Sequence, residues 1–214
     1  MEAQYPQWTR PAVAAIGPYG FGSRATFAPA TTVWDRSMIQ LQCTARLLKR
    51  LRVAPAPRRA ASDSYMGDWH ANVMFLGHTP HVIAVNDESL VTVVLPLKEV
   101  GTLVARWRTE VIGLIARLGL PSEVVQAEAI AMQDMAVTRS GDRSSVGCMN
   151  EMTRHCRGIY EDRGALSTPD VDRLIENMPC QALRFEIPAQ VARRLLRARL
   201  EPPAARLTAP RPRE

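Results

Sequence analysis

The sequence lacks the features that define several common protein classes. It has no run of about 18 apolar residues, so we expect no membrane-spanning helix. Its first residues lack a basic segment followed by an apolar stretch, which argues against a secretory signal. Its four cysteines are widely spaced and form no C-x-x-C pair, a pattern more typical of reduced thiols than of disulfides or a zinc site. These absences predict a soluble cytoplasmic protein with no membrane partner.

The composition is sufficient for a folded domain with additional segments. A length of 214 residues with 46% hydrophobic side chains provides a substantial core. Residues 1–37 contain many prolines and glycines without helix or strand periodicity, so we expect a disordered leader. Residues 201–214 are rich in proline, alanine and arginine, and we expect a disordered basic tail. The folded domain is therefore predicted to span residues 38–200, with Met38 as its native start.

Positive charge is concentrated in two flanking segments. The net charge is +6, but residues 61–183 carry more acidic than basic side chains. Residues 184–214 are rich in arginine. Residues 38–60 contain no acid, and their basic side chains are Arg46, Lys49, Arg50, Arg52, Arg58 and Arg59. Such flanks could bind nucleic acid through its phosphates, whereas solvated arginines that serve only solubility would give the same composition.

The periodicity of apolar residues predicts an α+β fold. Residues 39–43 alternate as in a half-buried strand, and residues 69–76, 81–87 and 90–95 are predicted as strands of an antiparallel meander. Residues 135–139 match a further short strand. Helical spacing is present over residues 45–51, 97–118, 122–131, 144–162, 167–178 and 188–200. We therefore expect a single domain in which a small antiparallel β-sheet packs against several α-helices.

A first polar cluster lies at the start of the strand predicted over residues 69–76. Strand alternation places Asp68 and His70 on one face of the sheet and Trp69 on the other. If Gly77–Pro80 closes the hairpin with two or four residues, His70 faces Asp87, with Cβ atoms roughly 5 Å apart. An Asp–His contact can orient the imidazole as a general base, and His with nearby carboxylates can also bind a metal. A purely structural pair at the open end of the hairpin is the alternative.

A second polar cluster spans residues 142–151. Arg143 and Ser144 come just before or at the start of a helix, where free backbone N–H groups and a positive dipole end favour a phosphate or carboxylate. Ordinary capping by Ser144 or Ser145 is the alternative. Polar groups that are costly to bury singly can satisfy one another, so we expect the two clusters to converge. The candidate ligand-binding residues are Trp69, Asn72, Asn86, Arg143, Ser144 and Asn150.

Several stretches together resemble a bacterial family known as domain of unknown function 6933. They are Met38–Thr44, Asp68–Asn72, Val85–Asp87, Arg143–Glu151 and Met178–Cys180, so the resemblance covers about residues 38–183. The resemblance implies no established reaction, cofactor or residue role. Members of the family occur beside proteins of plasmid and mobile-element origin, so the resemblance implies an association with mobile elements.

The sequence supports three functional hypotheses. The favoured one is a non-enzymatic binding or regulatory domain, associated with mobile elements. The second is a hydrolase, most plausibly a nuclease, with Asp68, His70 and Asp87 as catalytic residues. The third is a nucleic-acid-binding protein that acts through its arginine-rich flanks. No metal site is predicted, and the sequence leaves the cofactor and the partner unknown.

Overall fold

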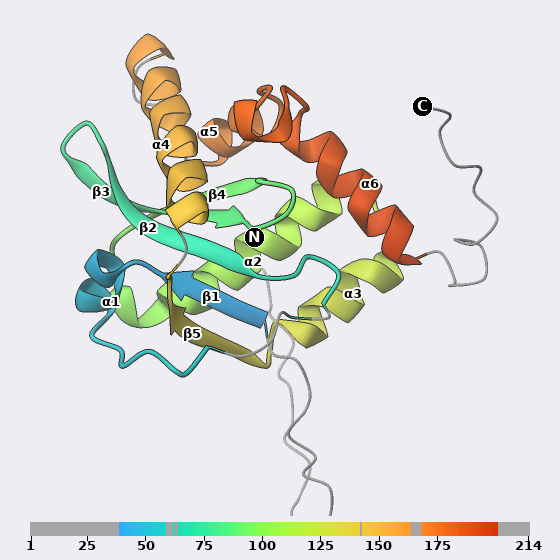
Figure 1. Ribbon diagram of the computed structural model, residues 1–214, viewed down its shortest axis with the longest axis horizontal. Coiled ribbons are helices and arrows are strands. Elements are labelled where there is room, and N and C mark those ends of the chain that lie inside the picture. The colour runs from blue at the N-terminus through green and yellow to red at the C-terminus, as the bar shows by residue number, and fades with distance from the viewer. Residues whose placement is uncertain (1–38, 59–61, 63, 142, 164–167, 201–214) are drawn as a thin grey trace, which may run out of the picture. The chain divides into compact units, whose positions relative to one another are not determined.

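The fold is built on one five-stranded β-sheet. The computed structural model describes residues 39–58, 62, 64–141, 143–163 and 168–200 (Figure 1). The strands are β1 (Ile39–Cys43), β2 (Trp69–Leu76), β3 (Thr79–Asn86), β4 (Thr92–Pro96) and β5 (Met135–Arg139). Their order across the sheet is β4-β3-β2-β1-β5. The predicted leader over residues 1–37 and the predicted tail over residues 201–214 lie outside the described residues.

The sheet is mixed, so the prediction of a purely antiparallel sheet is wrong. Strands β2, β3 and β4 form the expected antiparallel meander, but β1 is parallel to both β2 and β5. Long connections explain the difference, because a parallel neighbour needs a crossover of a dozen or more residues. The chain between β1 and β2 contains α1 (Ala45–Leu51), and the chain between β4 and β5 contains α2 (Leu103–Arg117) and α3 (Ser122–Ala131).

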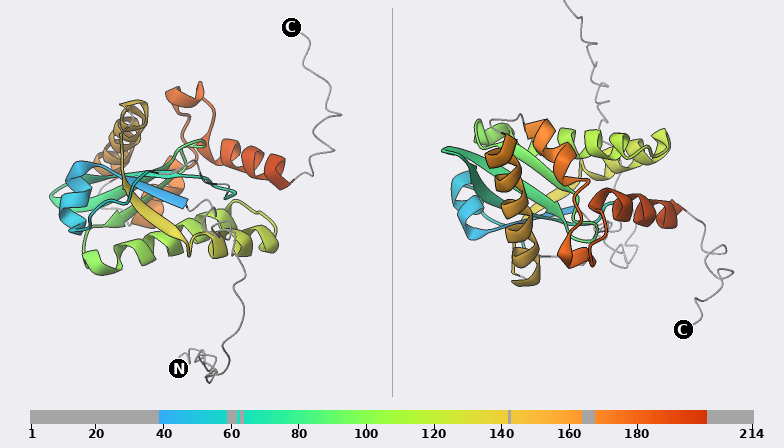
Figure 2. Two further views of the ribbon diagram at one scale, coloured as in Figure 1. Left: turned by 60° about the horizontal axis from the view of Figure 1, so that its bottom comes forward. Right: turned by 90° about the horizontal axis from the view of Figure 1, so that it is seen from above.

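Helices cover both faces of the sheet. The remaining helices are α4 (Arg143–Arg163), α5 (Thr168–Ile175) and α6 (Pro188–Leu200), with short 3-10 turns at Val100–Thr102 and Gln181–Leu183. Figure 2 shows α2 and α3 on one side of the sheet and α4 and α5 on the other. The predicted helix over residues 97–118 begins later, at Leu103, because Glu99 takes a left-handed φ of 49° that a helix cannot accommodate. No helix of the described residues is long and apolar enough to cross a membrane.

Each face of the sheet has its own hydrophobic core. Trp69, Val93 and Trp107 belong to the core beneath the sheet, where α2 packs. Ile83 and Val94 belong to the core on the opposite face, together with apolar residues of α4 and α5. Because successive strand residues point to opposite faces, this partition fixes which face each polar side chain occupies.

The β2–β3 hairpin has a different register from the predicted one. Gly77 and His78 alone form the turn, and Leu76 pairs with Thr79. Gly77 takes a φ of 55°, which glycine adopts without strain. His70 therefore lies opposite Val85 rather than Asp87. The predicted register placed Thr79 and Pro80 in the turn, although both belong to β3.

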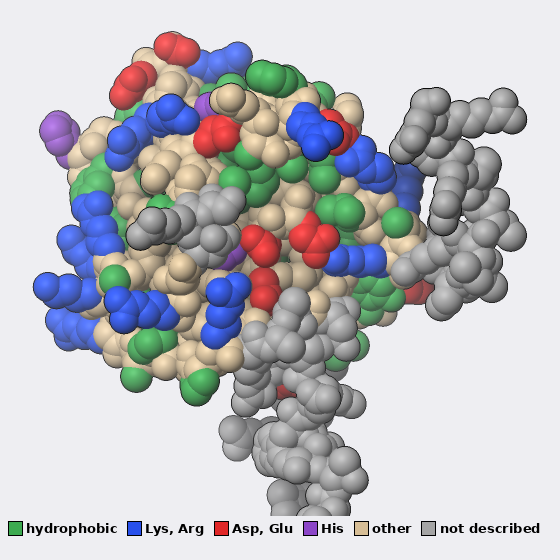
Figure 3. Space-filling model, in the orientation of Figure 1, with side chains coloured by type: hydrophobic (Ala, Val, Ile, Leu, Met, Phe, Trp, Pro, Cys, Tyr) green, Lys and Arg blue, Asp and Glu red, His purple; other side chains and the backbone are tan. Residues whose placement is uncertain are grey.

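The surface charge is uneven, as the sequence indicates. Figure 3 shows Lys and Arg side chains gathered on the side of the molecule where Figure 1 places α1. Arg46, Lys49, Arg50 and Arg52 are all exposed there. The basic segment that precedes residue 60 thus forms one surface of the folded protein.

Candidate functional site

The His70–Asp87 contact is present despite the changed register. His70 Nε2 lies 2.9 Å from Asp87 Oδ1, because Asp87 directly follows β3 and its side chain reaches back across the hairpin. The backbone N–H of Asp87 also donates to the carbonyl of Asp68 at 3.0 Å and closes the open end of the hairpin. His70 is only 3% exposed, whereas the Asp87 side chain is 46% exposed. The pair thus connects a buried imidazole to the surface.

The contact with Asp87 fixes the chemistry of the His70 ring. A carboxylate can only accept a hydrogen bond, so His70 Nε2 carries the proton that it donates to Asp87. In the neutral ring, Nδ1 is then an acceptor. This Nδ1 is buried and has no hydrogen-bond partner. The second ring nitrogen is therefore an acceptor without a partner.

Asp68 is held by the neighbouring strand. Its Oδ1 accepts from the Gln40 backbone N–H at 3.0 Å, and its Oδ2 accepts from Gln40 Nε2 at 2.9 Å. Burial raises the pKa of this carboxyl, and the negative charge of Asp87 raises it further, while the Gln40 hydrogen bonds lower it. Both oxygens of Asp68 thus bind β1. This use of both oxygens weakens the case for Asp68 as a catalytic group.

Two predicted ligand-binding asparagines contact other parts of the chain. Asn86 Nδ2 donates to the carbonyls of Met66 at 2.7 Å and Asp68 at 3.2 Å, while its Oδ1 accepts from Ser89. Asn72 Oδ1 accepts from Thr44 Oγ1 at 2.7 Å. These bonds hold loops and the start of α1 against the sheet, so both side chains have clear structural roles.

Trp69 lies on the opposite face of the sheet from His70, as alternation predicts. It is fully buried and packs edge-to-face on Trp107, with ring centroids 5.7 Å apart. A ligand at His70 cannot reach it. The candidate ligand-binding residue Trp69 therefore points away from His70, because neighbouring residues of β2 lie on opposite faces of the sheet.

The second polar cluster meets the first at the start of α4. Ser145 Oγ donates to Asp87 Oδ1 at 3.4 Å. A cavity of about 110 Å³, which we call the Asp87 cavity, opens beside this contact. Its lining residues are His70, Val85, Asn86, Asp87, Leu90, Ser145 and Cys148. The two clusters are thus neighbours in space.

The residues of α4 that line this cavity differ from the predicted ones. Asn150 is exposed and does not line the Asp87 cavity. The side chains of Arg143 and Ser144 lie outside the described part of the chain. Sequence analysis named neither Ser145 nor Cys148 as a ligand-binding residue, although their i,i+3 spacing on a helix places them on one face. That spacing was the feature of the sequence from which both residues could have been predicted to line one site.

Three polar side chains form a row across the neighbouring strands β2, β1 and β5, on the face of the sheet to which His70 belongs. Gln42 pairs in register with His70 on one side and with Thr138 on the other. We call Gln42, His70 and Thr138 the polar row. All three are at least 97% buried, and each has a buried atom without a hydrogen-bond partner: Gln42 Oε1, His70 Nδ1 and Thr138 Oγ1. The row is unusual, since buried polar atoms in proteins are nearly always hydrogen-bonded.

Sequence analysis missed Gln42 and Thr138. The alternation of residues 39–43 predicted a half-buried strand with Gln40 and Gln42 toward solvent, but every residue of β1 is buried. The reason is topological: β1 pairs in parallel with both of its neighbours, and parallel strands are typically buried on both faces. A glutamine in such a strand can be recognised as a buried site residue only once the order of the strands is known.

The described residues offer little for metal or thiol chemistry. No three His, Cys, Asp or Glu side chains among them lie close enough to bind a metal ion. Burial raises the pKa of the Cys43 thiol to about 12 and raises that of Cys156 as well. A thiol with a raised pKa is protonated at neutral pH and is a poor nucleophile. Both cysteines therefore act as small apolar side chains.

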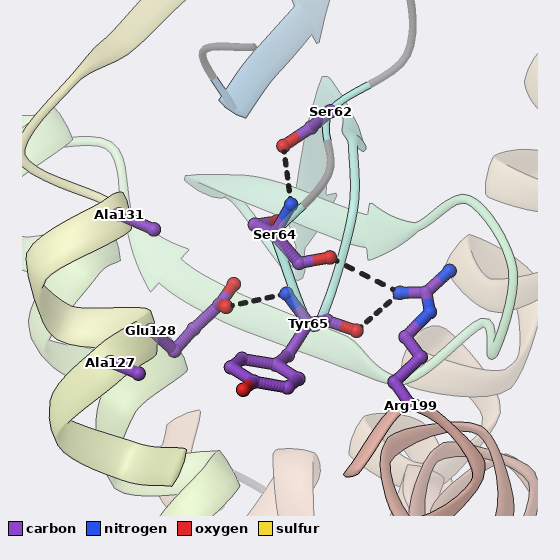
Figure 4. Close-up of a pocket in the computed structure, with 7 residues that line it drawn as sticks. All are labelled: Ser62, Ser64, Tyr65, Ala127, Glu128, Ala131 and Arg199. Carbon is purple, nitrogen blue, oxygen red and sulfur yellow. Dashed lines mark hydrogen bonds between the residues drawn. The ribbon is translucent and has the colours of Figure 1, made fainter. Parts of the chain in front are cut away.

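A larger cavity of about 520 Å³ lies beside the loop that leads into β2 (Figure 4). Glu128 on α3 accepts from the backbone N–H groups of Tyr65 at 2.9 Å and Met66 at 3.3 Å. Arg199 on α6 donates to the carbonyls of Ser64 and Tyr65 and pairs with Glu88. The polar groups of this cavity thus satisfy one another. They clamp the loop that precedes Asp68 and thereby position the polar cluster.

Comparison with known proteins identifies the family to which the chain belongs. No curated protein and no solved structure matches the chain. A family model described as Domain of unknown function (DUF6933) matches residues 40–191, which include most of β1, the His70–Asp87 pair and the whole of α4. Because this match covers most of the sequence, the chain belongs to the DUF6933 family.

Proposed function

We propose that this protein is a non-enzymatic binding domain whose ligand site consists of the polar row and the Asp87 cavity, which have His70 in common. One observation carries the proposal: three neighbouring buried side chains each have a polar atom without a partner. An unpaired buried polar atom costs roughly 1–3 kcal/mol. Three such atoms side by side are best explained by a ligand that supplies the missing hydrogen bonds.

The atoms of the site favour a ligand with hydrogen-bond donors and a positive charge. Gln42 Oε1 and the Nδ1 of neutral His70 are acceptors, and the Thr138 hydroxyl can accept as well. The carboxylate of Asp87 lies at the cavity and adds negative charge. A volume of about 110 Å³ fits a small group rather than a whole nucleotide. The ligand class is therefore a guanidinium or a primary ammonium group, on a small molecule or at the end of a side chain.

The same geometry gives less support to the hydrolase hypothesis. A nucleophilic hydrolase needs a base that contacts the nucleophile, with a third group that orients the base. Here Asp87 lies between the other two groups, since it contacts both His70 Nε2 and Ser145 Oγ. Ser145 thus contacts the carboxylate of Asp87. Catalysis would instead need the His70 imidazole to contact Ser145 and accept the proton of its hydroxyl. This order of contacts is the reverse of the catalytic one.

The proposal is tested by titrating the isotope-labelled full chain with methylguanidinium or methylammonium and following the His70 and Thr138 signals by NMR. We expect saturable shifts with both cations and none with acetate, because the site offers acceptors and negative charge. His70→Ala and Thr138→Val should abolish the shifts. The matched controls are His78→Ala and Thr109→Val, which change exposed residues away from the site.

Two outcomes would overturn the proposal. One is the absence of saturable shifts with either cation in the folded wild-type protein. The other is a response that persists in both His70→Ala and Thr138→Val, which would place any binding elsewhere. Thr138→Val preserves shape, so the test does not depend on a variant that leaves a cavity in the sheet.

A further inference from the structure

The exposed basic side chains around α1 carry positive charge that has no counterpart nearby. Arg46, Lys49 and Arg50 project from α1, and Arg52 follows its last residue. We call these four residues the α1 basic surface. Each is exposed. None of the four takes part in a salt bridge with another described residue. No acidic residue occurs between positions 36 and 62. The positive charge is thus available to a partner.

Local structure explains part of this charge but not all of it. Lys49 and Arg50 lie in the last turn of α1, where basic side chains stabilise the helix dipole. Arg46 lies in the first turn, where a positive charge is unfavourable. It is also four residues from Arg50, so the two like charges repel by a few tenths of a kcal/mol. Arg46 therefore has no stabilising electrostatic role within α1.

The surface is shaped as well as charged. A groove of about 780 Å³ runs between α1 and the 3-10 turn at Val100–Thr102, lined by all four basic residues together with Leu51, Val100 and Gly101. The Arg46 guanidinium lies over the Phe75 ring, 5.2 Å from its centroid, and this cation–π contact holds it at the groove. Glu99 is adjacent in sequence to the groove, but Lys98 precedes it. The groove thus combines a defined shape with a concentration of positive charge.

We propose that the α1 basic surface binds the phosphate backbone of double-stranded nucleic acid without reading its sequence. The repeated basic side chains along one groove match the repeated charge of a phosphate backbone. The lining residues include no aromatic side chain on which unpaired bases could stack, so the groove fits a duplex better than a single strand. This inference is independent of the cation site proposed above, because the two sites share no residue.

The test is fluorescence anisotropy with a labelled DNA duplex of about 20 base pairs, over a range of salt concentrations. The variant carries Arg46→Gln, Lys49→Gln and Arg50→Gln in the full chain. The matched control carries Arg154→Gln, Arg173→Gln and Arg197→Gln, three exposed arginines on other helices that change the net charge equally. Thermal unfolding of both variants verifies that they fold.

We expect the α1 variant to bind at least about tenfold more weakly at low salt. Its slope of log Kd against log salt should fall by about 2.7, that is about 0.9 for each lost phosphate contact. The control should change Kd less than about threefold. An equal loss in both variants would mean that only net charge matters and would overturn the proposal. Tighter binding to single-stranded DNA or to anionic lipid vesicles than to the duplex would overturn it as well.

Discussion

Asp172 provides the sharpest test of the energetics of this fold. It lies on α5, is only 2% exposed, and its Oδ1 accepts from the backbone N–H of Val94 at 2.8 Å. Strand β4 is an edge strand of the described sheet. The Asp172 carboxyl therefore accepts the hydrogen bond that a further strand would otherwise accept from Val94. Burial, together with the negative charges of Glu176 and Glu110, raises the pKa of Asp172 to about 8. The Val94 hydrogen bond and Arg117 lower it.

The raised pKa makes the stability of the protein depend on pH. A carboxyl with a higher pKa in the folded state binds its proton more tightly after folding. The stability that the protonated Asp172 provides is therefore fully present below the unfolded-state pKa of 3.8. It is lost as the pH rises through the folded-state pKa of about 8. A difference of about four pKa units corresponds to at most about 6 kcal/mol at about 1.4 kcal/mol per unit.

Two variants separate the charge of Asp172 from its hydrogen bond. Asp172→Asn keeps an oxygen for the Val94 N–H and cannot ionise, so its free energy of unfolding should fall less than that of the wild type between pH 5 and pH 8.5. Asp172→Ala leaves the buried N–H without an acceptor and should lose about 1–3 kcal/mol at pH 5. Urea unfolding followed by tryptophan fluorescence at pH 5, 7 and 8.5 measures both effects.

Asp162→Asn is the control, because Asp162 is an exposed carboxyl on α4. It should leave the pH dependence unchanged. The reasoning fails if Asp172→Asn and the wild type lose the same free energy between pH 5 and pH 8.5. That result would mean that the buried carboxyl ionises without cost, for instance because Arg117 neutralises it fully.

Two further substitutions test the contacts that position the polar cluster. Thr44→Ala removes the N-cap of α1 and the hydrogen bond to Asn72, so thermal unfolding should show a loss of about 1–2 kcal/mol; an unchanged melting temperature would contradict this role. Glu128→Ala leaves the buried N–H groups of Tyr65 and Met66 without acceptors and should cost more than Glu128→Gln, which keeps one oxygen. Equal urea midpoints for the two Glu128 variants would refute the clamp.

Much of the fold could be predicted because local patterns determine it. The strands at residues 39–43, 69–76 and 135–139 agree with the structure, since alternation and β-branched residues define them locally. The helices at residues 45–51, 122–131 and 188–200 agree as well, because Thr44, Ser122 and Pro188 mark their starts. The parallel placement of β1 and β5 could not be predicted, because strand order depends on packing between segments far apart in the sequence.

The candidate site was predictable only in part, for the same reason. The contact between His70 and Asp87 could be predicted because the hairpin is a local structure. The contact forms even though the predicted register was wrong, because the Asp87 side chain reaches across the hairpin. Gln42 and Thr138 enter the site through the pairing of β1 with β2 and β5. Such pairing leaves no mark in the amino-acid pattern of any one strand.

The polar row differs from the other buried polar positions of the strands. Gln40, His81, Asn86 and Thr92 are buried strand residues with hydrogen-bond partners, whereas Gln42 and Thr138 each leave a buried polar atom without one, at positions where apolar residues would be more stable. Natural proteins accept such departures mainly at functional sites. Thr138→Val should therefore leave the free energy of unfolding unchanged or raise it while abolishing cation binding. A loss of stability instead would mean that the hydroxyl has a structural partner, and the row would then belong to the fold alone.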